Sequence, residues 1–240
     1  FEVTGSVPPY SYFWDSGQIT QDVNNINAGS YIINVLDNNG CTHSNTITLN
    51  EPTSLVGTIQ SSNNYNSYDV SCTGYLDGGV SLIINGSVPP YDYTWNNGAT
   101  NQNLTNIGAG FYSVQVVDDN NCIINQDITL TEPIDFSSTY TVSDYNGFNI
   151  SCFNDNDGVI DYSLGGSVPP YSFNWTGPNN FQSNSEDNSN LYEGVYTLQV
   201  IDINNCVYYE TIILEEPTEI IYNLYTETDT CERNIGLALV

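Results

Sequence analysis

The chain has 240 residues and a formal net charge of −27, with 28 acidic side chains against a single Lys or Arg. This balance excludes a nucleic-acid binder, which needs cations to displace counterions from phosphate, and it excludes attraction to an anionic membrane. Hydrophobic residues make up 39% of the chain and aromatic residues 12%, which is too much for a disordered acidic tail.

Composition also indicates a fold class and a compartment. The 19 tyrosines, with many Thr, Ile and Val, favour strands, and the abundant Asn, Asp, Gly and Ser favour turns. No apolar run approaches the roughly 20 residues that a membrane-spanning helix needs. The 6 cysteines include no C-x-x-C pair, so they predict disulfides in an extracellular, oxidising compartment rather than a zinc site. Because methionine is absent, we expect a segment of a longer or processed protein.

A long internal repeat dominates the sequence. The hexapeptide Gly-Ser-Val-Pro-Pro-Tyr begins at Gly5, Gly86 and Gly166, and a Glu-Pro pair closes each unit. The predicted units are residues 1–52 (truncated at the start), 53–133, 134–217 and 218–240 (the start of a fourth). Their short Pro-containing junctions restrict hinge motion between units.

Alternating apolar residues predict short strands in chain order. We expect them at 29–35 in the first unit, at 80–84, 91–95, 110–116 and 128–130 in the second, and at 194–200 in the third. Asn- and Gly-rich turns follow several of these strands, as tight hairpins require. About seven short strands in about 80 residues predict an all-β fold of tandem immunoglobulin/PKD-like β-sandwich repeats.

Each unit supplies candidate core aromatics. Each tryptophan alternates with another aromatic residue, as in the predicted strand 91–95, and this pattern is typical of a sandwich core. A tyrosine is the first residue on the inward face of each of the strands 29–35, 110–116 and 194–200. The predicted core residues are Trp14, Trp95, Trp175, Tyr31, Tyr112 and Tyr196. The alternative is that the tryptophans stack on sugar rings, as aromatic residues do in lectin-like modules.

The order of motifs resembles a known family. PPY-x-[YF]-x-W, a Gly-rich turn, G-x-Y-x-[LIV]-x-V-x-D-x-N-x-C and a closing EP resemble the SprB-type repeat of Bacteroidetes gliding-motility surface adhesins, and so does N-I-S-C-F-N-D-N-D-G-V-I around Cys152. The resemblance covers essentially the whole chain in three copies. It implies a cell-surface protein that is exported by the type IX secretion system and that has the motility machinery as a partner. The third unit departs from the others by a longer middle segment, residues 176–193.

One loop resembles half of a calcium site. Its oxygen-bearing residues precede Gly158 and are Asn154, Asp155, Asn156 and Asp157. Calcium prefers such ligands, but no Glu follows before Glu186 to act as the bidentate ligand of an EF-hand. Calcium is therefore one hypothesis for this loop, and an ordinary turn is the other.

The sequence offers little that could support catalysis, and we predict no enzyme. His43 is the only histidine, so a Ser-His-Asp set could occur once at most in an architecture that repeats. The sequence contains no Gly-rich phosphate loop and no metal-ligand cluster, and we predict no cofactor other than the calcium considered above. Lysine is absent, which rules out Lys–Asn isopeptide bonds and leaves disulfides as the covalent links.

Two disulfide schemes fit the spacing of the cysteines. Pairing within units gives Cys72–Cys122 and Cys152–Cys206, with Cys41 and Cys231 bonded outside the segment. Pairing between neighbours gives Cys41–Cys72, Cys122–Cys152 and Cys206–Cys231. We favour the first scheme, because it lets each unit fold independently and closes loops of about 50 residues.

Two functions of different classes fit this repeat. The first is a stalk or adhesive filament of a large cell-surface adhesin, whose partners are the other repeats of its own chain. The second is a module that binds a surface polysaccharide, another substratum or a protein through variable loops such as 176–193. Near-identical units favour the stalk, because recognition sites usually break repetition. An accessory domain of a secreted hydrolase would require catalytic sequence elsewhere.

Overall fold

The structure is a computed structural model that describes residues 2–227 and 237–239. The described residues contain strands and a single 3₁₀ turn, η1 (Pro178–Asn180), and no α-helix. The backbone packs into two compact units: one contains residues up to 58, 83–94 and 115–126, and the other contains residues 59–82, 95–114 and those from 127 onward. The repeat boundaries inferred from the sequence remain a prediction.

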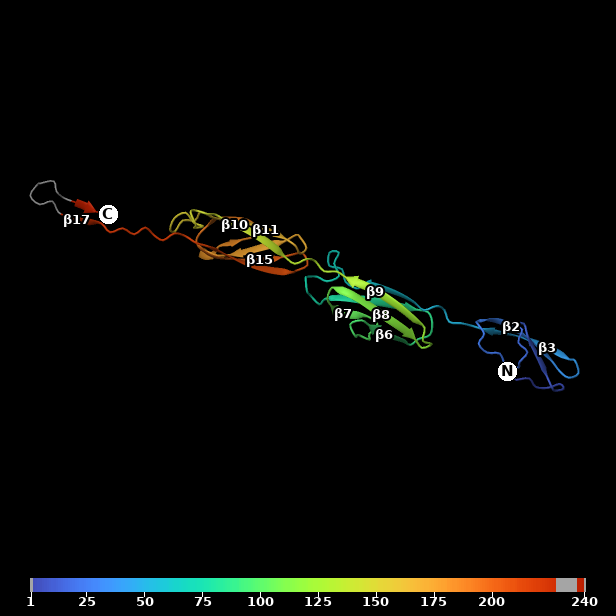
Figure 1. Ribbon diagram of the computed structural model, residues 1–240. Helices are drawn as coiled ribbons and strands as arrows, with labels where there is room; N and C mark the ends of the chain where they lie inside the picture. The colour runs from blue at the N-terminus through green and yellow to red at the C-terminus, as the bar shows by residue number, and fades with distance from the viewer. Residues whose placement is uncertain (1, 228–236, 240) are drawn as a thin grey trace, which may run out of the picture. The chain divides into compact units, whose positions relative to one another are not determined.

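The third repeat is built from two antiparallel sheets, and some of its strands are labelled in Figure 1. The first sheet has the order β10 (Ser137–Val142), β11 (Gly158–Gly165), β14 (Asn188–Leu191). The second has the order β13 (Gln182–Ser183), β12 (Ser172–Thr176), β15 (Gly194–Ile201), β16 (Val207–Leu214). Taken in chain order, these are the A-B-E and C′-C-F-G sheets of an immunoglobulin sandwich.

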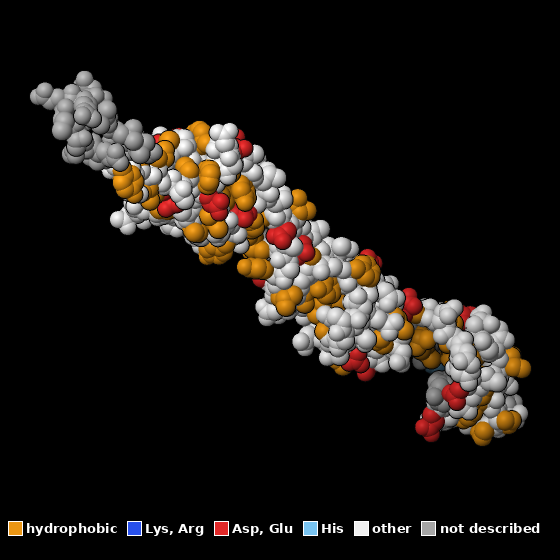
Figure 2. Space-filling model, turned by 60° about the vertical axis from the view of Figure 1, so that its left-hand side comes forward, with side chains coloured by type: hydrophobic (Ala, Val, Ile, Leu, Met, Phe, Trp, Pro, Cys, Tyr) orange, Lys and Arg blue, Asp and Glu red, His pale blue; other side chains and the backbone are white. Residues whose placement is uncertain are grey.

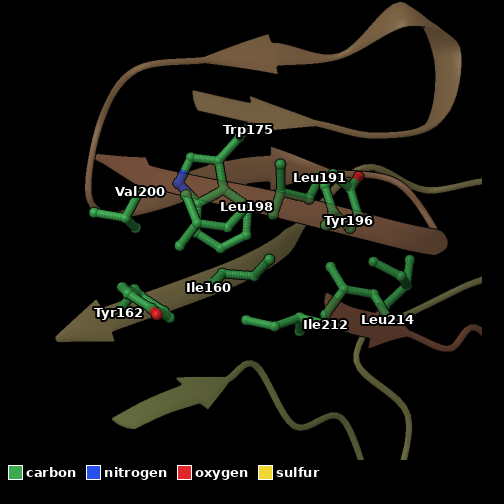
Figure 3. Close-up of a cluster of buried hydrophobic side chains, with 10 residues drawn as sticks. Ile160, Tyr162, Trp175, Leu191, Tyr196, Leu198, Val200, Ile212 and Leu214 are labelled. Atoms are coloured by element: carbon green, nitrogen blue, oxygen red, sulfur yellow. The ribbon is translucent and has the colours of Figure 1, made fainter. Parts of the chain in front are cut away.

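The core of the third repeat lies between its two sheets (Figure 3). Successive side chains of a strand point to opposite faces, so Tyr196, Leu198 and Val200 of β15 are buried while Val195 and Thr197 are exposed. Across the core, Tyr162 of β11 meets Trp175 of β12 edge to face, with ring centroids 5.6 Å apart. The buried side chains of this core are Ile150, from the loop before β11, and Ile160, Tyr162, Trp175, Leu191, Tyr196, Leu198, Val200, Ile212 and Leu214 from the two sheets.

The second repeat has the same strand order. Its sheets are β4 (Val56–Ser61), β5 (Gly78–Asn85), β7 (Leu104–Ile107) and β6 (Tyr91–Trp95), β8 (Gly110–Asp118), β9 (Ile123–Leu130). The recurrence of the A-B-E and C-F-G orders confirms the predicted all-β fold of tandem immunoglobulin-like sandwiches. The predicted strands at 80–84, 91–95, 110–116 and 128–130 all lie within observed strands.

The first repeat contributes one sheet, the counterpart of C-F-G. Its order is β1 (Ser11–Trp14), β2 (Gly29–Leu36), β3 (Thr42–Leu49). Ile33 is fully buried against Trp14, whereas β3 is exposed along its whole length. After the third repeat, a short hairpin pairs β17 (Tyr225–Glu227) with β18 (Leu237–Leu239). No helix in the described residues is long and apolar enough to cross a membrane.

Candidate functional site

A buried aspartate organises one end of each repeat. In the third repeat, Asp202 accepts a hydrogen bond from the Ser167 hydroxyl at 2.6 Å and one from the Val168 amide at 3.1 Å. Its other oxygen accepts the amides of Asn204 at 2.9 Å and Cys206 at 2.8 Å. The D-x-N-x-C hairpin is thereby tied to the Gly-Ser-Val-Pro-Pro-Tyr corner.

The same carboxylate contacts recur in the other repeats. Asp118 accepts the Ser87 hydroxyl and the amides of Val88, Asn120 and Cys122. Asp37 has the equivalent four donors, which are the Ser6 hydroxyl and the amides of Val7, Asn39 and Cys41. The sequence pattern assigned these aspartates to turns and did not reveal their contact with the Ser-Val pair about 30 residues upstream. The common spacing of the two motifs in all repeats is the signal that could have revealed it.

Hydrogen bonding favours the ionised form of two of these carboxyls, Asp37 and Asp118. The hydroxyl of Ser87 is the largest cause of a lowered pKa for Asp118, and Ser6 has the same effect on the pKa of Asp37. Donors that bond the ionised form favour it. A carboxyl that stays ionised well below neutral pH is poorly matched to proton transfer at physiological pH, so these groups serve the structure.

The Pro-Pro corner also clamps the residues that follow each Glu-Pro junction. The amide of Ser167 donates to the carbonyl of Ile134 at 2.9 Å, and the amide of Ser87 donates to that of Thr53 at 2.7 Å. Gly166 has a φ of +79°, and a Cβ there would lie 2.0 Å from the Asp135 carbonyl oxygen. The corner therefore requires glycine for both its backbone conformation and its close approach.

Tyrosine hydroxyls close the same corners. Tyr171 and Tyr10 donate to the carbonyls of Gly166 and Gly5, and Tyr91 donates to that of Gly86 at 2.6 Å. The Pro-Pro bond inside each corner is cis. The hexapeptide is thus a structural motif whose polar atoms are bonded within the repeat.

The predicted core aromatics differ in how deeply they are buried. Trp95 and Trp175 are 2% and 0% exposed, Tyr196 is 1% exposed, and Trp14 is buried less completely. Tyr31 and Tyr112 are half-buried. Each indole nitrogen donates to a backbone carbonyl, at 2.9, 2.8 and 3.0 Å for Trp14, Trp95 and Trp175. Because burial removes the ring faces of Trp95 and Trp175 from solvent, neither can stack on a sugar ring.

The three tyrosines also have a common hydrogen bond. The hydroxyls of Tyr31, Tyr112 and Tyr196 donate to the carbonyls four residues upstream, at 2.7, 3.0 and 3.0 Å. Such a bond from the start of strand F is the tyrosine corner of immunoglobulin-like sandwiches. The aromatic ring of each tyrosine packs toward the core, while its hydroxyl bonds to the turn that precedes the strand and holds that turn in place.

The proposed calcium loop is held by hydrogen bonds within the repeat. Asp157 accepts the Ser151 amide at 3.0 Å, and contacts with Ser151 lower the pKa of Asp157. The closing Glu216 accepts the amide of Asn154 at 2.7 Å, as Glu132 does from Gly74 at the same distance in the second repeat. Among the described residues no three His, Cys, Asp or Glu side chains gather to hold a metal. Calcium at Asn154–Asp157 remains a prediction, which calorimetric titration with calcium chloride would test.

The disulfide found in the structure corrects the predicted pairing. Cys72 of the second repeat is bonded to Cys206 of the third, with 5.7 Å between their Cα atoms. Neither predicted scheme contains this pair. Cys41, Cys122 and Cys152 are free and exposed, and Cys231 lies outside the described residues.

Strand length explains why the within-repeat pairs do not form. Cys206 directly precedes β16, and the amides of Asn149 and Ile150, beside Cys152, donate to the Glu215 carbonyl just beyond its other end. Eight strand residues span about 27 Å at roughly 3.4 Å per residue, whereas the Cα atoms of a disulfide lie within about 7 Å. Cys72 and Cys122 are separated in the same way, by the length of β9. Cys122 directly precedes β9, whereas the Asp69 amide, close to Cys72 in the chain, donates to the carbonyl of Thr131 just beyond the other end of β9.

Polar contacts surround the disulfide. The side-chain amide of Asn204 donates to the carbonyls of Ser71 at 3.1 Å and Tyr65 at 3.3 Å, and Asn66 donates to the Asn204 side chain at 2.5 Å. Cys72 and Cys206 are 5% and 4% exposed. The sequence did not predict this site. A strand pattern does not show that the hairpin of one repeat contacts the loop before the second strand of another repeat, which we call the leading loop.

Comparison with known proteins identifies the repeat. The family model of the SprB repeat matches residues 64–100 and 148–180, which confirms the resemblance at two segments. Both segments run from the leading loop with its cysteine through the Pro-Pro corner. These two segments of the chain are therefore similar to the SprB repeat. No curated protein matches it significantly.

Solved structures show only distant likeness. A C-terminal 282-residue fragment of intimin, solved in complex with the intimin-binding domain of its translocated receptor, is 10% identical with a TM-score of 0.28. The match covers 78% of this chain and 57% of the intimin fragment. A chain of the Dpr2 Ig1–Ig2 complex with DIP-Theta Ig1–Ig3 is 11% identical with a TM-score of 0.27. That match covers 88% of this chain and 90% of the other. The N-terminal eight Ig domains of the Down syndrome cell adhesion molecule are 12% identical with a TM-score of 0.26. That match covers 86% of this chain and 36% of the other.

Proposed function

We propose that this chain is part of the extracellular stalk or adhesive filament of a large surface adhesin of the gliding-motility type, exported by type IX secretion. The observation that carries the proposal is that the aspartate of the hairpin, the tyrosine of the Pro-Pro corner and the core tryptophan of each repeat hydrogen-bond to atoms of their own repeat. The Asp118, Tyr91 and Trp95 contacts recur at the equivalent positions of the other repeats. Repetition therefore preserves a folded unit, which suits a spacer that needs length, solubility and resistance to proteases.

The repeat boundaries at 1–52, 53–133, 134–217 and 218–240 belong to this proposal. The clamp at Thr53 and Ile134 supports them, since each of these residues directly follows a Glu-Pro pair and is bound by its own repeat's corner. The partners we propose are the neighbouring repeats, the secretion and motility machinery, and a surface polysaccharide or other substratum at the adhesive end.

Two measurements test the stalk. An antibody against residues 1–240 should label intact, unpermeabilised cells that make the parent protein, and labelling that needs permeabilised cells would refute surface exposure. In-frame deletion of residues 53–133 should leave the binding specificity of the adhesin unchanged, because a spacer contributes reach. Loss of adhesion to one substratum alone would favour a binding module instead.

A second candidate is a binding module, and the outer face of β15 and β16 favours it in the third repeat. Tyr209 is 64% exposed and its hydroxyl accepts a 2.8 Å hydrogen bond from Gln199, while Val195 and Ile213 pair across the same face and are 53% and 59% exposed. The second repeat has Asn125 where the third has Tyr209. In the view of Figure 2, orange hydrophobic patches lie between scattered red carboxylates.

A glycan array separates the two candidates. The 240-residue chain and its Tyr209→Asn variant would be compared, because the substitution installs the residue of the second repeat on a solvent-exposed face. The stalk proposal expects no glycan signal from either protein. A signal that disappears in Tyr209→Asn would establish the binding module.

A further inference from the structure

The disulfide joins two different kinds of cysteine. Cys72 belongs to the leading loop that precedes the second strand of its repeat, and Cys206 belongs to the D-x-N-x-C hairpin of the next repeat. We call the first kind leading cysteines and the second kind hairpin cysteines. The leading cysteines are Cys72, Cys152 and Cys231, and the hairpin cysteines are Cys41, Cys122 and Cys206.

The leading loop of the third repeat has the same build as that of the second. Tyr145 and Phe148 form the bridge that Tyr65 and Tyr68 form, with a 2.7 Å amide-to-carbonyl bond in each. Asn66 and Asn146 have similar positive φ values of 51° and 58°. Ser71 and Ser151 donate their amides to Asp77 and Asp157 at 3.1 and 3.0 Å. The surface that receives a hairpin at Cys72 is therefore present again at Cys152.

The hairpin of the second repeat matches that of the third. Asp118 holds the amides of Asn120 and Cys122 at 3.0 and 2.6 Å, and Asp202 holds those of Asn204 and Cys206 at 2.9 and 2.8 Å. Asn120 occupies the place of Asn204, the residue whose side chain contacts the facing loop. Both halves of the bonded site thus exist a second time, with the thiols of Cys122 and Cys152 exposed.

We propose that Cys122 and Cys152 are the two half-sites of one recurring repeat-to-repeat disulfide. Cys152 bonds the hairpin cysteine of a repeat that follows it, and Cys122 bonds the leading cysteine of a repeat that precedes it. The partner in each case is another repeat of this sequence type. The inference deepens the proposed function and rests on it in one respect, since such bonds persist in an oxidising compartment.

The bond forms by thiol–disulfide exchange. A disulfide oxidant such as oxidised glutathione is attacked by one cysteine thiolate, which releases one reduced glutathione and leaves a mixed disulfide. The second cysteine thiolate then attacks that mixed disulfide and releases the other glutathione. Two thiols lose two protons and two electrons in total, and the electrons reduce the oxidant to two thiols.

A lengthened chain tests the proposal directly. A second copy of residues 53–240 is placed directly after Pro217, which creates the junction Glu-Pro-Thr that already occurs at residues 51–53. The protein is oxidised with glutathione at low concentration and its monomer isolated, capped with N-ethylmaleimide and digested with Glu-C and chymotrypsin, because one Arg and no Lys make trypsin unsuitable. We expect a peptide that links Cys152 to Cys122, beside the one that links Cys72 to Cys206.

The 240-residue chain is the matched control. Its monomer should contain the Cys72–Cys206 peptide, with Cys122 and Cys152 both capped by N-ethylmaleimide. In the lengthened chain, Cys152→Ser in the first copy should leave every Cys122 capped while Cys72–Cys206 persists, which shows that folding is intact. Peptides that link Cys72 to Cys122 or Cys152 to Cys206 would overturn the proposal. So would a lengthened chain that forms Cys72–Cys206 and leaves Cys152 fully capped. The experiment is independent of cell-surface location, so its failure is distinguishable from failure of the adhesin role.

Discussion

At the scale of single residues, Asp118 and Asp37 make the stability of the folded protein depend on pH. The folded protein lowers the pKa of Asp118 below its ordinary value of 3.8, so this carboxyl adds stability above that pH. The contribution is lost as the pH falls through the lowered pKa of the folded state. Asp37 has the same contacts and its pKa is shifted in the same direction.

Asp118→Asn should therefore lower the thermal midpoint at pH 7 and flatten its decline between about pH 5 and pH 2. Asp119→Asn is the matched control, because it removes the same charge from an exposed neighbouring residue. Circular dichroism melts in 1 M salt would measure both, since the screening length there is about 3 Å and the repulsion of the net charge is suppressed. Equal midpoints for the two variants at pH 7 would refute the structural role of Asp118.

The core tryptophan sets a second residue-scale prediction. Trp175 is fully buried and meets Tyr162 edge to face, so Trp175→Ala should cost about 3–5 kcal/mol in the free energy of unfolding. Trp175→Phe should cost less, because it keeps an aromatic ring and loses the 3.0 Å bond to the Ser185 carbonyl. Urea denaturation measures both values. A near-unchanged free energy for Trp175→Ala would place this side chain outside the core.

At the scale of elements, the Pro-Pro corner depends on glycine in a way that can be isolated. Gly166 and Gly147 both have positive φ, at +79° and +96°, but a Cβ would strike the Asp135 backbone only at Gly166. Gly147→Ala should lose about 1–2 kcal/mol of stability through backbone conformation alone. Gly166→Ala should lose clearly more stability than Gly147→Ala. The added Cβ would clash with the Asp135 backbone and force the Pro-Pro corner away from the residues that follow the Glu-Pro junction. Thermal melts of the two variants that coincide would contradict this.

Alternation predicted the strands that carry regularly spaced apolar residues better than the polar strands. The predicted strands 110–116 and 194–200 lie in β8 and β15, where every second residue is apolar. The edge strand β10 was not predicted, because Ser137–Val142 contains mainly Ser and Thr. Such a strand forms because it pairs with β11 along its whole length, which is a tertiary effect on a sequence without a clear period.

At the scale of the whole molecule, the disulfide links residues that are far apart in the sequence. It closes a loop with a sequence separation of 134 residues. In the chain-entropy model such a loop contributes about 5 kcal/mol. Cys72→Ser should therefore lower the free energy of unfolding of the oxidised protein by up to about that amount, measured by urea denaturation.

Cys122→Ser is the control for that measurement. Its thiol is free and exposed, so the substitution should change the stability of the 240-residue chain very little. Adding a reductant should remove the difference between the original chain and Cys72→Ser. If Cys122→Ser were destabilised as much as Cys72→Ser, the bond would instead join Cys72 to Cys122 within the second repeat, as the within-repeat scheme predicts.

The sequence by itself determined the repeat, the all-β class, the family resemblance and the place of Trp95 and Trp175 in the core. These properties follow from local patterns, since a strand buries every second side chain and three copies expose the period directly. The prediction that the chain does not bind nucleic acid follows as directly from a charge of −27.

Only the tertiary structure decided which cysteines meet and what the aspartate of each hairpin does. Cysteine spacing measures distance along the chain, whereas a disulfide requires Cα atoms within about 7 Å in space. The length of β16 separates Cys152 from Cys206, and the meeting of a hairpin with a leading loop brings Cys206 to Cys72. Asp202 likewise contacts Ser167 and Val168, which are 35 and 34 residues away along the chain, because the fold brings the hairpin and the Pro-Pro corner together.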